Sequence, residues 1–285
     1  MSKIICADAA AGLKSLPPDS VRMCVTSPPY YGLRDYGADG QIGIEQTTQE
    51  YIARLVEVFA EVYRVLKPDG TLWLNIGDMY SNRTRGIVKQ KDLIGIPWTL
   101  AFALRERGWY LRSDIIWHKT NALPESVKDR PTRCYEHVFL LSKSPKYYYD
   151  YKAIQEPITE ATAERYTRHR SGKAKYAGTD IEQDIDRRLD AVTEENRRFR
   201  RKPDIWEVST NTYKMDEHFA MYPEKLIEPC ILAGSAKGDT VLDPFFGSGT
   251  TGAAAKRLGR EYIGIELNPK FCEKAYARIE NAVRE

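Results

Sequence analysis

Residues 239–268, DTVLDPFFGSGTTGAAAKRLGREYIGIELN, carry the clearest fold signal in this chain of 285 residues. A short apolar run, Thr240–Leu242, leads into Asp243 and a turn rich in glycine. An alanine-rich segment of helical composition follows, and a second apolar run, Glu261–Ile265, ends in Glu266. The glycines at 247, 249 and 252 have the spacing G-x-G-x-x-G. This order of strand, glycine turn, helix and strand predicts one unit of a parallel α/β sheet with a ligand-binding turn.

The chemistry of this turn favours a nucleoside cofactor. Glycines let a ligand approach the backbone, and the N-terminus of the following helix favours a carboxylate or a phosphate. Glu266 would accept hydrogen bonds from the two hydroxyls of a ribose, and Asp243 either bonds the cofactor or braces the turn. The turn alone leaves NAD and S-adenosylmethionine open. The candidate cofactor-binding residues of this stretch are Asp243, Pro244, Phe245, Gly247, Ser248, Gly249, Thr250, Glu266, Leu267 and Asn268.

Short apolar runs alternate with helical stretches elsewhere, which predicts an α/β fold with a mostly parallel central sheet. The other expected strands are Lys3–Cys6, Val21–Thr26, Thr71–Ile76, Tyr110–Trp117 and Tyr135–Leu141. The expected helices are the stretch TTQEYIARLVEVFAEVYRVLKPDG, with a capping box at Thr47 and Glu50 and a stop at Pro68 and Gly70, then Leu93–Arg107, Glu224–Ala233, Thr250–Leu258 and Pro269–Val283. A dinucleotide fold usually places its glycine turn first. Here the turn comes near the C-terminus, which favours S-adenosylmethionine.

A second turn, TSPPYYG at residues 26–32, follows the apolar run Val21–Val25. Two successive prolines have preset φ angles and no N–H, so the backbone is stiff. The Pro28 carbonyl is then a rigidly aimed acceptor, with the Ser27 hydroxyl beside it and the flat ring of Tyr30 nearby. This combination suits a planar group that carries N–H donors. Because both turns should lie at the carboxyl edge of the sheet, we expect transfer of a methyl group from the cofactor to an amine.

With these two motifs, the sequence resembles the amino-methylating DNA methyltransferases, which act on cytosine N4 or adenine N6, in their permuted β-class arrangement. TSPPY matches the catalytic motif of that family, DPFFGSGTT its cofactor loop, and YIGIELN supplies the acid for the ribose. The resemblance covers nearly the whole chain and implies a Rossmann-like methyltransferase fold that binds S-adenosyl-L-methionine. The implied catalytic residues are Ser27, Pro28, Pro29 and Tyr30.

The resemblance also implies roles for flanking segments. Asp8 would meet the adenine, although it could instead cap a helix, and His218 would help to hold the methionine end, although a structural role is equally open for it. Thr26 is a further cofactor-binding candidate. The segments DIIWHKTN (114–121) and YEHVFLLSK (135–143) resemble strands that line the pocket for the target base.

Charge dominates from about Lys152 to Pro203, where helical and strand periodicity fade. We therefore expect residues 1–151 to form the catalytic half, 152–205 a target-recognition region and 206–285 the cofactor-binding half. A solvated insertion would have the same composition, but basic residues interleaved with aromatic ones suit contact with DNA. The candidate DNA-binding residues are Arg168, Arg170, Lys173, Lys175, Arg197, Arg198, Arg200 and Arg201.

Composition restricts the partners only broadly. The formal net charge of +3 suits an anionic partner, here double-stranded DNA. The five cysteines and four histidines lack the spacing of a metal site or a disulfide framework, so we expect reduced thiols and no metal. The sequence has no membrane-spanning run and no signal peptide, which favours the cytoplasm. A homodimer and a cognate restriction endonuclease both stay open.

An exocyclic amino group is a poor nucleophile because its lone pair is delocalised into the ring. We expect Ser27 Oγ and the Pro28 carbonyl to accept its two N–H bonds, Tyr30 to stack on the base, and the base to be flipped out of the duplex. Serine at the first motif position favours cytosine N4, with adenine N6 as the alternative. Methylation of RNA or of a protein amide, and a non-catalytic module that binds nucleic acid or NAD, are more remote alternatives.

Overall fold

The computed structural model describes residues 2–33, 37, 40–84, 87–161, 164, 198–210 and 222–282. The chain divides into two compact units, one formed by Met1–Asp150 with Asp204–Glu285 and the other by Tyr151–Pro203. No helix within the described ranges is long and apolar enough to cross a membrane.

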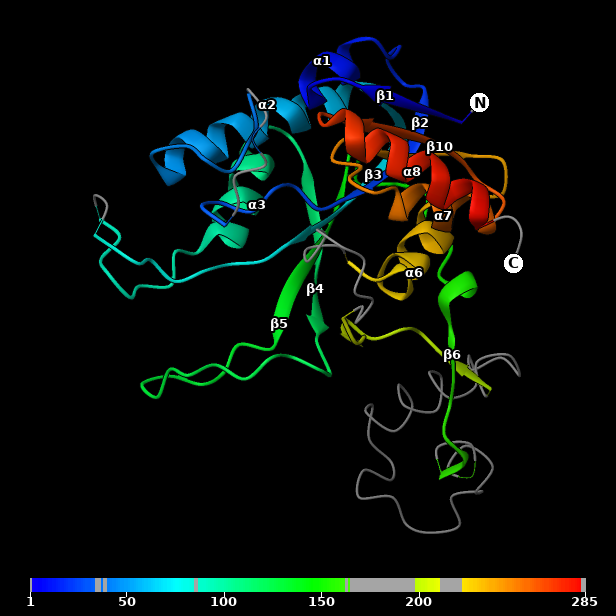
Figure 1. The fold of residues 1–285 in the computed structure, drawn as a ribbon. Helices are drawn as coiled ribbons and strands as arrows, with labels where there is room; N and C mark the ends of the chain where they lie inside the picture. Colours follow the sequence, from blue (N-terminus) through cyan, green and yellow to red (C-terminus); the bar gives the residue numbers. More distant parts are fainter. Residues whose placement is uncertain are drawn as a thin grey trace. The chain divides into compact units, whose positions relative to one another are not determined.

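The first unit is built on a sheet of eight strands, whose order is β1–β10–β9–β2–β3–β5–β4–β8 (Figure 1). β1, β10, β9, β2 and β3 are parallel, β5 is antiparallel to β3 and β4, and β8 is parallel to β4. The predicted α/β class with a mostly parallel sheet is therefore confirmed. The strands are β1 (Lys3–Cys6), β2 (Val21–Thr26), β3 (Leu66–Ile76), β4 (Tyr110–His118), β5 (Tyr135–Ser142), β8 (Ile205–Glu207), β9 (Thr240–Asp243) and β10 (Glu261–Glu266).

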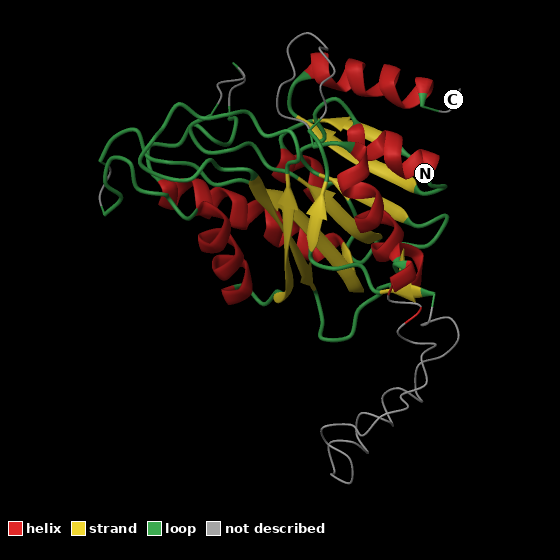
Figure 2. Ribbon diagram, turned by 90° about the horizontal axis from the view of Figure 1, so that it is seen from below, coloured by secondary structure: helices red, strands yellow, loops and turns green. Residues whose placement is uncertain are grey.

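Helices cover both faces of this sheet (Figure 2). α1 and α3 both pack on α2 on one face, and α6 and α8 both pack on α7 on the other. A sheet whose strands are buried on both faces requires a layer of helices on each face. The helices are α1 (Ala9–Lys14), α2 (Thr48–Val65), α3 (Ile96–Glu106), α6 (Glu224–Gly234), α7 (Thr250–Arg257) and α8 (Pro269–Asn281).

Helix α2 begins as predicted, since the Thr47 side chain accepts from the Glu50 backbone and the Glu50 side chain from the Thr47 backbone. Its predicted stop is wrong in detail. The helix ends at Val65, and Pro68 lies within β3, which begins earlier than the predicted Thr71. The pairing of β3 with β2 is irregular at this point, and a proline in a strand interior is tolerated at such irregularities.

The order of the strands creates a switch point between β2 and β9. From β2 the chain passes through α2 to β3, on one side, and from β9 it passes through α7 to β10, on the other. In an open α/β sheet, ligands bind outside the carboxyl ends of the strands where the connections diverge in this way. Both turns singled out in the sequence follow these two strands.

The second unit contains a 3₁₀ turn, Lys152–Ile154, and a short antiparallel pair, β6 (Glu156–Pro157) with β7 (Phe199–Arg200). Within this unit Glu156 accepts from Arg200 and from Lys202, at 3.0 and 2.7 Å. From Asp204 onward the chain belongs to the first unit again, where β8 pairs with β4.

Candidate active site

The two turns meet at the switch point through a buried hydrogen bond. Thr26, the last residue of β2, donates from Oγ1 to Oδ1 of Asp243, the last residue of β9, over 2.6 Å. Both side chains are buried, and 217 residues separate them along the chain. The start of the TSPPY turn is therefore held directly against the start of the glycine turn.

Asp243 braces this junction. Oδ1 also accepts from the backbone N–H of Phe245 at 3.0 Å, and Oδ2 accepts from the hydroxyls of Tyr222 and Thr251. Burial raises the pKa of Asp243, and these donors oppose the increase. Four donors occupy the acceptor sites that a carboxylate has, so the geometry favours the bracing alternative over a direct bond to the cofactor.

Glu266 lies at the carboxyl end of β10, beside the glycine turn. Its Oε2 accepts from the backbone N–H of Gly247, and its Oε1 accepts from that of Asn268, both over 2.8 Å. Each oxygen retains capacity for a second donor, as two ribose hydroxyls would require. Burial is the main cause that raises the pKa of Glu266 above its ordinary value of 4.5.

The glycine turn has the conformation that its residues predict. Gly247 and Gly249 have φ of 53° and 83°, in the left-handed region where a side chain is strained. A Cβ at Gly249 would also lie 2.8 Å from that of Ala275 in α8. The hydroxyls of Ser248 and Thr250 accept from Arg278 of α8, at 2.9 and 2.8 Å. Their predicted contact with the cofactor stays a prediction.

In the TSPPY turn, the two proline carbonyls have different surroundings. The Pro29 carbonyl accepts from the Tyr51 hydroxyl over 2.8 Å. The residues that the structure describes offer no hydrogen-bond donor to the Pro28 carbonyl. An acceptor without a donor inside the protein is what the predicted role of Pro28 toward an amine needs.

Tyr30 lies in a polar cluster whose members are far apart in the sequence. Its hydroxyl donates to Glu136 over 2.6 Å and lies 3.5 Å from Ser27 Oγ. Glu136 also accepts from Asn75 Nδ2 at 3.1 Å and pairs with Lys119. Lys119 and Glu136 lie in the two segments predicted to line the base pocket. No sequence pattern pointed to Asn75 in β3.

Most of the remaining predicted site residues divide into three groups. Asp8 caps α1, since Oδ1 accepts from the Ala11 N–H at 3.1 Å, and it lies near Glu266 because Cys6 of β1 pairs with Glu266 of β10. Pro244 and Phe245 begin the glycine turn after β9, and Leu267 follows Glu266 after β10. His218, Arg168, Arg170, Lys173, Lys175 and Arg197 lie outside the described residues.

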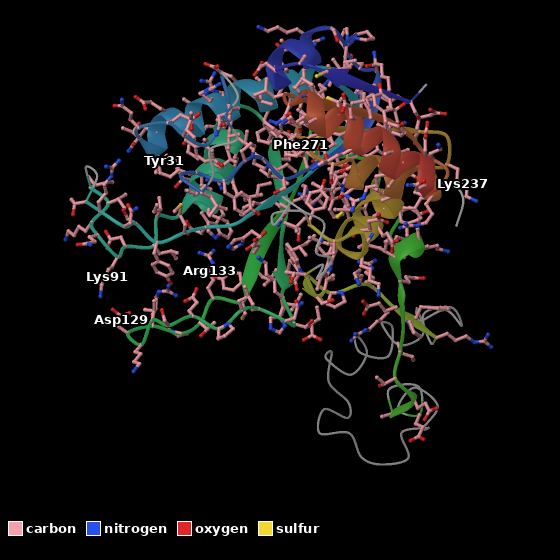
Figure 3. The ribbon with its side chains drawn as sticks, viewed as in Figure 1. Tyr31, Lys91, Asp129, Arg133, Lys237 and Phe271 are labelled. Atoms are coloured by element: carbon pink, nitrogen blue, oxygen red, sulfur yellow. The ribbon has the colours of Figure 1, made fainter. Side chains whose placement is uncertain are left out.

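Two loops after β3 and β4 are joined by side chains that point toward each other (Figure 3). Lys91 Nζ lies 2.9 Å from Asp129 Oδ2, and the Arg130 guanidinium lies 3.7 Å from the centre of the Tyr80 ring. These loops follow strands that end at the same edge of the sheet as the two turns.

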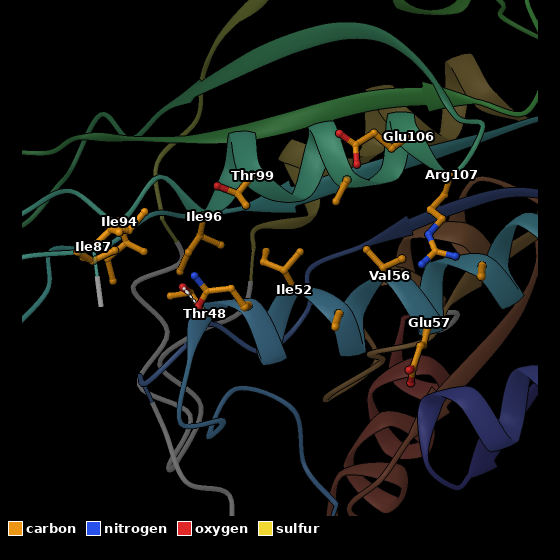
Figure 4. A pocket seen from close by; sticks show the side chains of 15 residues that line it. Thr48, Ile52, Val56, Glu57, Ile87, Ile94, Ile96, Thr99, Glu106 and Arg107 are labelled. Atoms are coloured by element: carbon orange, nitrogen blue, oxygen red, sulfur yellow. Dashed lines mark hydrogen bonds between the residues drawn. The ribbon is translucent and has the colours of Figure 1, made fainter. Parts of the chain in front are cut away.

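A cavity of about 540 Å³ lies between α2 and α3 (Figure 4). Apolar side chains such as Ile52, Val56 and Ile96 line it, with Glu57, Glu106 and Arg107 toward one end. None of the predicted site residues is among them. The site at the switch point is therefore defined by its turns and charges and not by this cavity.

The parallel sheet, the glycine turn with Glu266, and the adjoining Ser-Pro-Pro-Tyr turn define a Rossmann-like methyltransferase domain. A family model described as DNA methylase, which covers N6 and N4 enzymes, matches residues 21–277. The chain belongs to this family and is an S-adenosylmethionine-dependent DNA methyltransferase.

Individual proteins agree with this assignment. M.Cfr9I of Citrobacter freundii, a type II methyltransferase, is 46% identical over 294 residues, which cover 96% of this chain and 86% of the relative. M.SmaI of Serratia marcescens, also a type II methyltransferase, is 45% identical over 298 residues, covering 97% and 90%.

Solved structures share the fold. TTHA0409 of Thermus thermophilus, determined in complex with S-adenosyl-L-methionine, matches with a TM-score of 0.64 and 25% identity, covering 99% of this chain and 95% of its own. The cytosine-N4-specific PvuII DNA methyltransferase matches with a TM-score of 0.69 over 99% and 90%, and its 19% identity bears on the fold alone. The expected methyltransferase fold and its cofactor are thereby confirmed.

Proposed function

We propose that the protein methylates the N4 amino group of cytosine in double-stranded DNA. The observation that carries this proposal is the bond between Thr26 and Asp243, because it holds an amine-binding turn against a cofactor-binding turn. Serine at the first position of the catalytic motif favours cytosine, and adenine N6 is the alternative.

The residues of the first turn would prepare the amine. Ser27 Oγ and the Pro28 carbonyl each accept one N–H, which draws the nitrogen toward a pyramidal geometry and exposes its lone pair. Tyr30 stacks on the flipped base, and flipping costs a few kcal/mol. No residue needs to form a covalent bond with the base, and the methylated nitrogen would return to neutrality by losing one N–H proton to solvent. Catalysis then depends on alignment and electrostatics.

The residues of the second turn fit S-adenosylmethionine, which supplies a methyl group on a positively charged sulfur when bound. Glu266 has acceptor capacity for the ribose at the sheet edge, and Asp8 lies on the neighbouring strand connection. At Gly247 a Cβ would meet no atom of the described residues within 4 Å, so the backbone is open just before the N-terminus of α7. Pro244, Phe245, Leu267 and Asn268 would shape the rest of this binding site.

Cofactor binding should depend on pH through Glu266. The carboxylate accepts from the ribose, whereas its protonated form loses acceptor capacity, so affinity should fall as the pH drops through the pKa of this group. Because burial raises that pKa above 4.5, the loss should begin at a higher pH than an ordinary glutamate would give. Calorimetric titrations between pH 8 and 5 would measure this.

Glu266→Gln is the matched control for that titration. Its affinity should be lower at pH 8 and nearly independent of pH in this range. Parallel pH profiles for the wild type and this variant would remove Glu266 from the binding site.

We further propose the division of labour expected from the sequence, with residues 152–205 reading the target and 1–151 and 206–285 supplying the two halves of the enzyme. Since M.Cfr9I and M.SmaI are named type II methyltransferases, we propose that the protein protects a DNA site against a partner endonuclease.

Basic residues of the second unit should contribute to DNA affinity. Arg198, Arg200 and Arg201 are exposed, and replacing all three with alanine should weaken DNA binding. The slope of log K against log salt should flatten by about 0.9 for each phosphate that the variant no longer neutralises. Fluorescence anisotropy at several salt concentrations would measure both effects.

The charge-matched control replaces Arg105, Arg107 and Arg112, which are exposed near the amino edge of the sheet, opposite the site. That variant should keep the wild-type slope. Equal slopes for all three proteins would mean that the basic residues of the second unit are merely solvated.

Nucleoside mass spectrometry of DNA incubated with the protein and its cofactor tests the choice of base. N4-methylcytosine is the expected product. N6-methyladenine would replace the proposed base, and the absence of both would overturn the proposed function.

A further inference from the structure

Methyl transfer to an amine requires that the nitrogen lone pair face the methyl group. A serine hydroxyl beside that amine can either accept an N–H or donate its own proton to the lone pair. Donation would block the reaction. The direction of the Ser27 O–H bond therefore matters as much as its position.

Around Ser27 the structure offers a chain of hydroxyls that ends on a carboxylate. Ser27 Oγ lies 3.5 Å from the Tyr30 hydroxyl, at the long end of hydrogen bonding, and the Tyr30 hydroxyl lies 2.6 Å from Glu136 Oε2. Burial, and next the charge of Glu136, raise the pKa of Tyr30, so its phenol keeps its proton at neutral pH. That proton needs an acceptor inside the protein.

An ionised carboxylate can only accept hydrogen bonds. Glu136 has a side chain 12% exposed and is paired with Lys119, which can only donate. Asn75 Nδ2 adds a third donor to the same carboxylate, at 3.1 Å. Every neighbour of Glu136 in this cluster thus donates toward it.

The packing also keeps Tyr30 in this place. A Cβ at Gly77 would lie 2.8 Å from Cε2 of Tyr30 and 3.3 Å from Cδ of Glu136. Only glycine at the end of β3 leaves room for both groups. The hydroxyl of Tyr30 is therefore directed at Glu136 by a close fit as well as by charge.

We propose that Glu136 is a positioning residue that sets the proton direction at Ser27, an inference that rests on the proposed function. Glu136 accepts a hydrogen bond from the Tyr30 hydroxyl. The Tyr30 oxygen then accepts from Ser27, so Ser27 Oγ presents only lone pairs to the target amine. Lys119 and Asn75 hold the carboxylate in place. No proton is transferred along this chain, since only the orientation of each hydroxyl is fixed.

Glu136→Gln should reverse the direction of the hydrogen bonds from Ser27 through Tyr30 to residue 136. Lys119 can only donate, so the amide oxygen would turn toward Lys119 and the amide NH₂ toward Tyr30. The Tyr30 oxygen would then accept from the amide, and its own proton would turn to Ser27 Oγ or to Asn75 Oδ1, which lies 3.4 Å away, so Ser27 would lose the fixed direction of its O–H bond. With cofactor and DNA prebound, the single-turnover methylation rate should fall by about 10- to 100-fold, while the Kd for S-adenosylmethionine stays unchanged.

Tyr30→Phe keeps the ring but removes the link between Ser27 and Glu136. This variant should lose rate to a similar extent, and adding Glu136→Gln to it should cost little more, because the two residues act through one path. Glu61→Gln, which alters an ion-paired glutamate on α2, is the matched control and should keep the wild-type rate.

These results can be distinguished from a failure of the proposed function. An unchanged rate in Glu136→Gln, or an equal further loss in the Tyr30→Phe background, would overturn the role of Glu136 even if the product is N4-methylcytosine. If Glu136→Gln does not fold, as its melting temperature would show, a wild-type rate in Tyr30→Phe still overturns the inference. Coupled losses with N6-methyladenine as the product would support Glu136 and refute the choice of cytosine.

Discussion

Replacing Ser27 with alanine should lower the single-turnover rate of DNA methylation by roughly 10²- to 10³-fold, the loss seen when one preorganised polar contact is removed from an active site. The substitution deletes an acceptor for the target amine, so the nitrogen keeps its planar, poorly nucleophilic form. Calorimetry should find the affinity for S-adenosylmethionine unchanged, because the Ser27 hydroxyl is directed toward Tyr30, and the glycine turn is bonded by Thr26.

Ser20→Ala is the matched control for that experiment. Ser20 precedes β2 and its hydroxyl donates to the Pro17 carbonyl, at the amino end of the strand. It should methylate DNA at the wild-type rate. A Ser27→Ala enzyme as fast as this control would mean that the serine does not hold the amine.

Replacing Glu266 with alanine should weaken cofactor binding by roughly 10²-fold or more. Hydrogen bonds to a charged group contribute about 1.5–3 kcal/mol each, and the ribose would lose up to two of them. The variant would also leave the N–H groups of Gly247 and Asn268 without their acceptor, which loosens the turn. Calorimetric titration with S-adenosylmethionine would measure the loss.

Glu261 lies at the opposite end of the same strand, where it accepts from Ser2. Glu261→Ala therefore removes an equal charge from β10 at the far edge of the sheet. It should leave the dissociation constant unchanged. Equal affinities for Glu266→Ala and Glu261→Ala would contradict the placement of the ribose at the carboxyl edge.

Much of the fold follows from local sequence. The strands β1 and β2 have the predicted bounds, and β9 and β10 each extend one residue beyond them, because apolar runs flanked by turn residues mark both ends. Short elements were harder to predict: a helix after Asp8 was only an alternative and β8 was not expected, since the six residues of α1 and the three of β8 are too few for periodicity to show.

The candidate site was predictable only as separate motifs. That the two turns adjoin could be expected from the parallel sheet, yet the bond that joins them involves Thr26 and Asp243, far apart in sequence. The hydrogen bond between Tyr30 and Glu136 is a second example, because 106 residues separate these two residues along the chain. No local pattern reports such a contact, which depends on the antiparallel β5 bringing its first residues to the carboxyl edge.

Likewise, the sequence left the role of Asp243 open between cofactor contact and support of the turn. The two alternatives differ in how many donors inside the protein should surround the carboxylate. Tyr222 and Thr251 are two of the four, and neither was singled out beforehand. Supporting residues of this kind are recognised by side-chain geometry and not by motif.

The most direct measurement is a crystal structure of the protein with duplex DNA and a cofactor analogue that cannot transfer its methyl group. The account predicts a flipped cytosine whose amine lies between Ser27 Oγ and the Pro28 carbonyl, with the reacting end of the analogue roughly 3–3.5 Å from N4. An analogue bound away from the glycine turn, or an amine held by other residues, would contradict it.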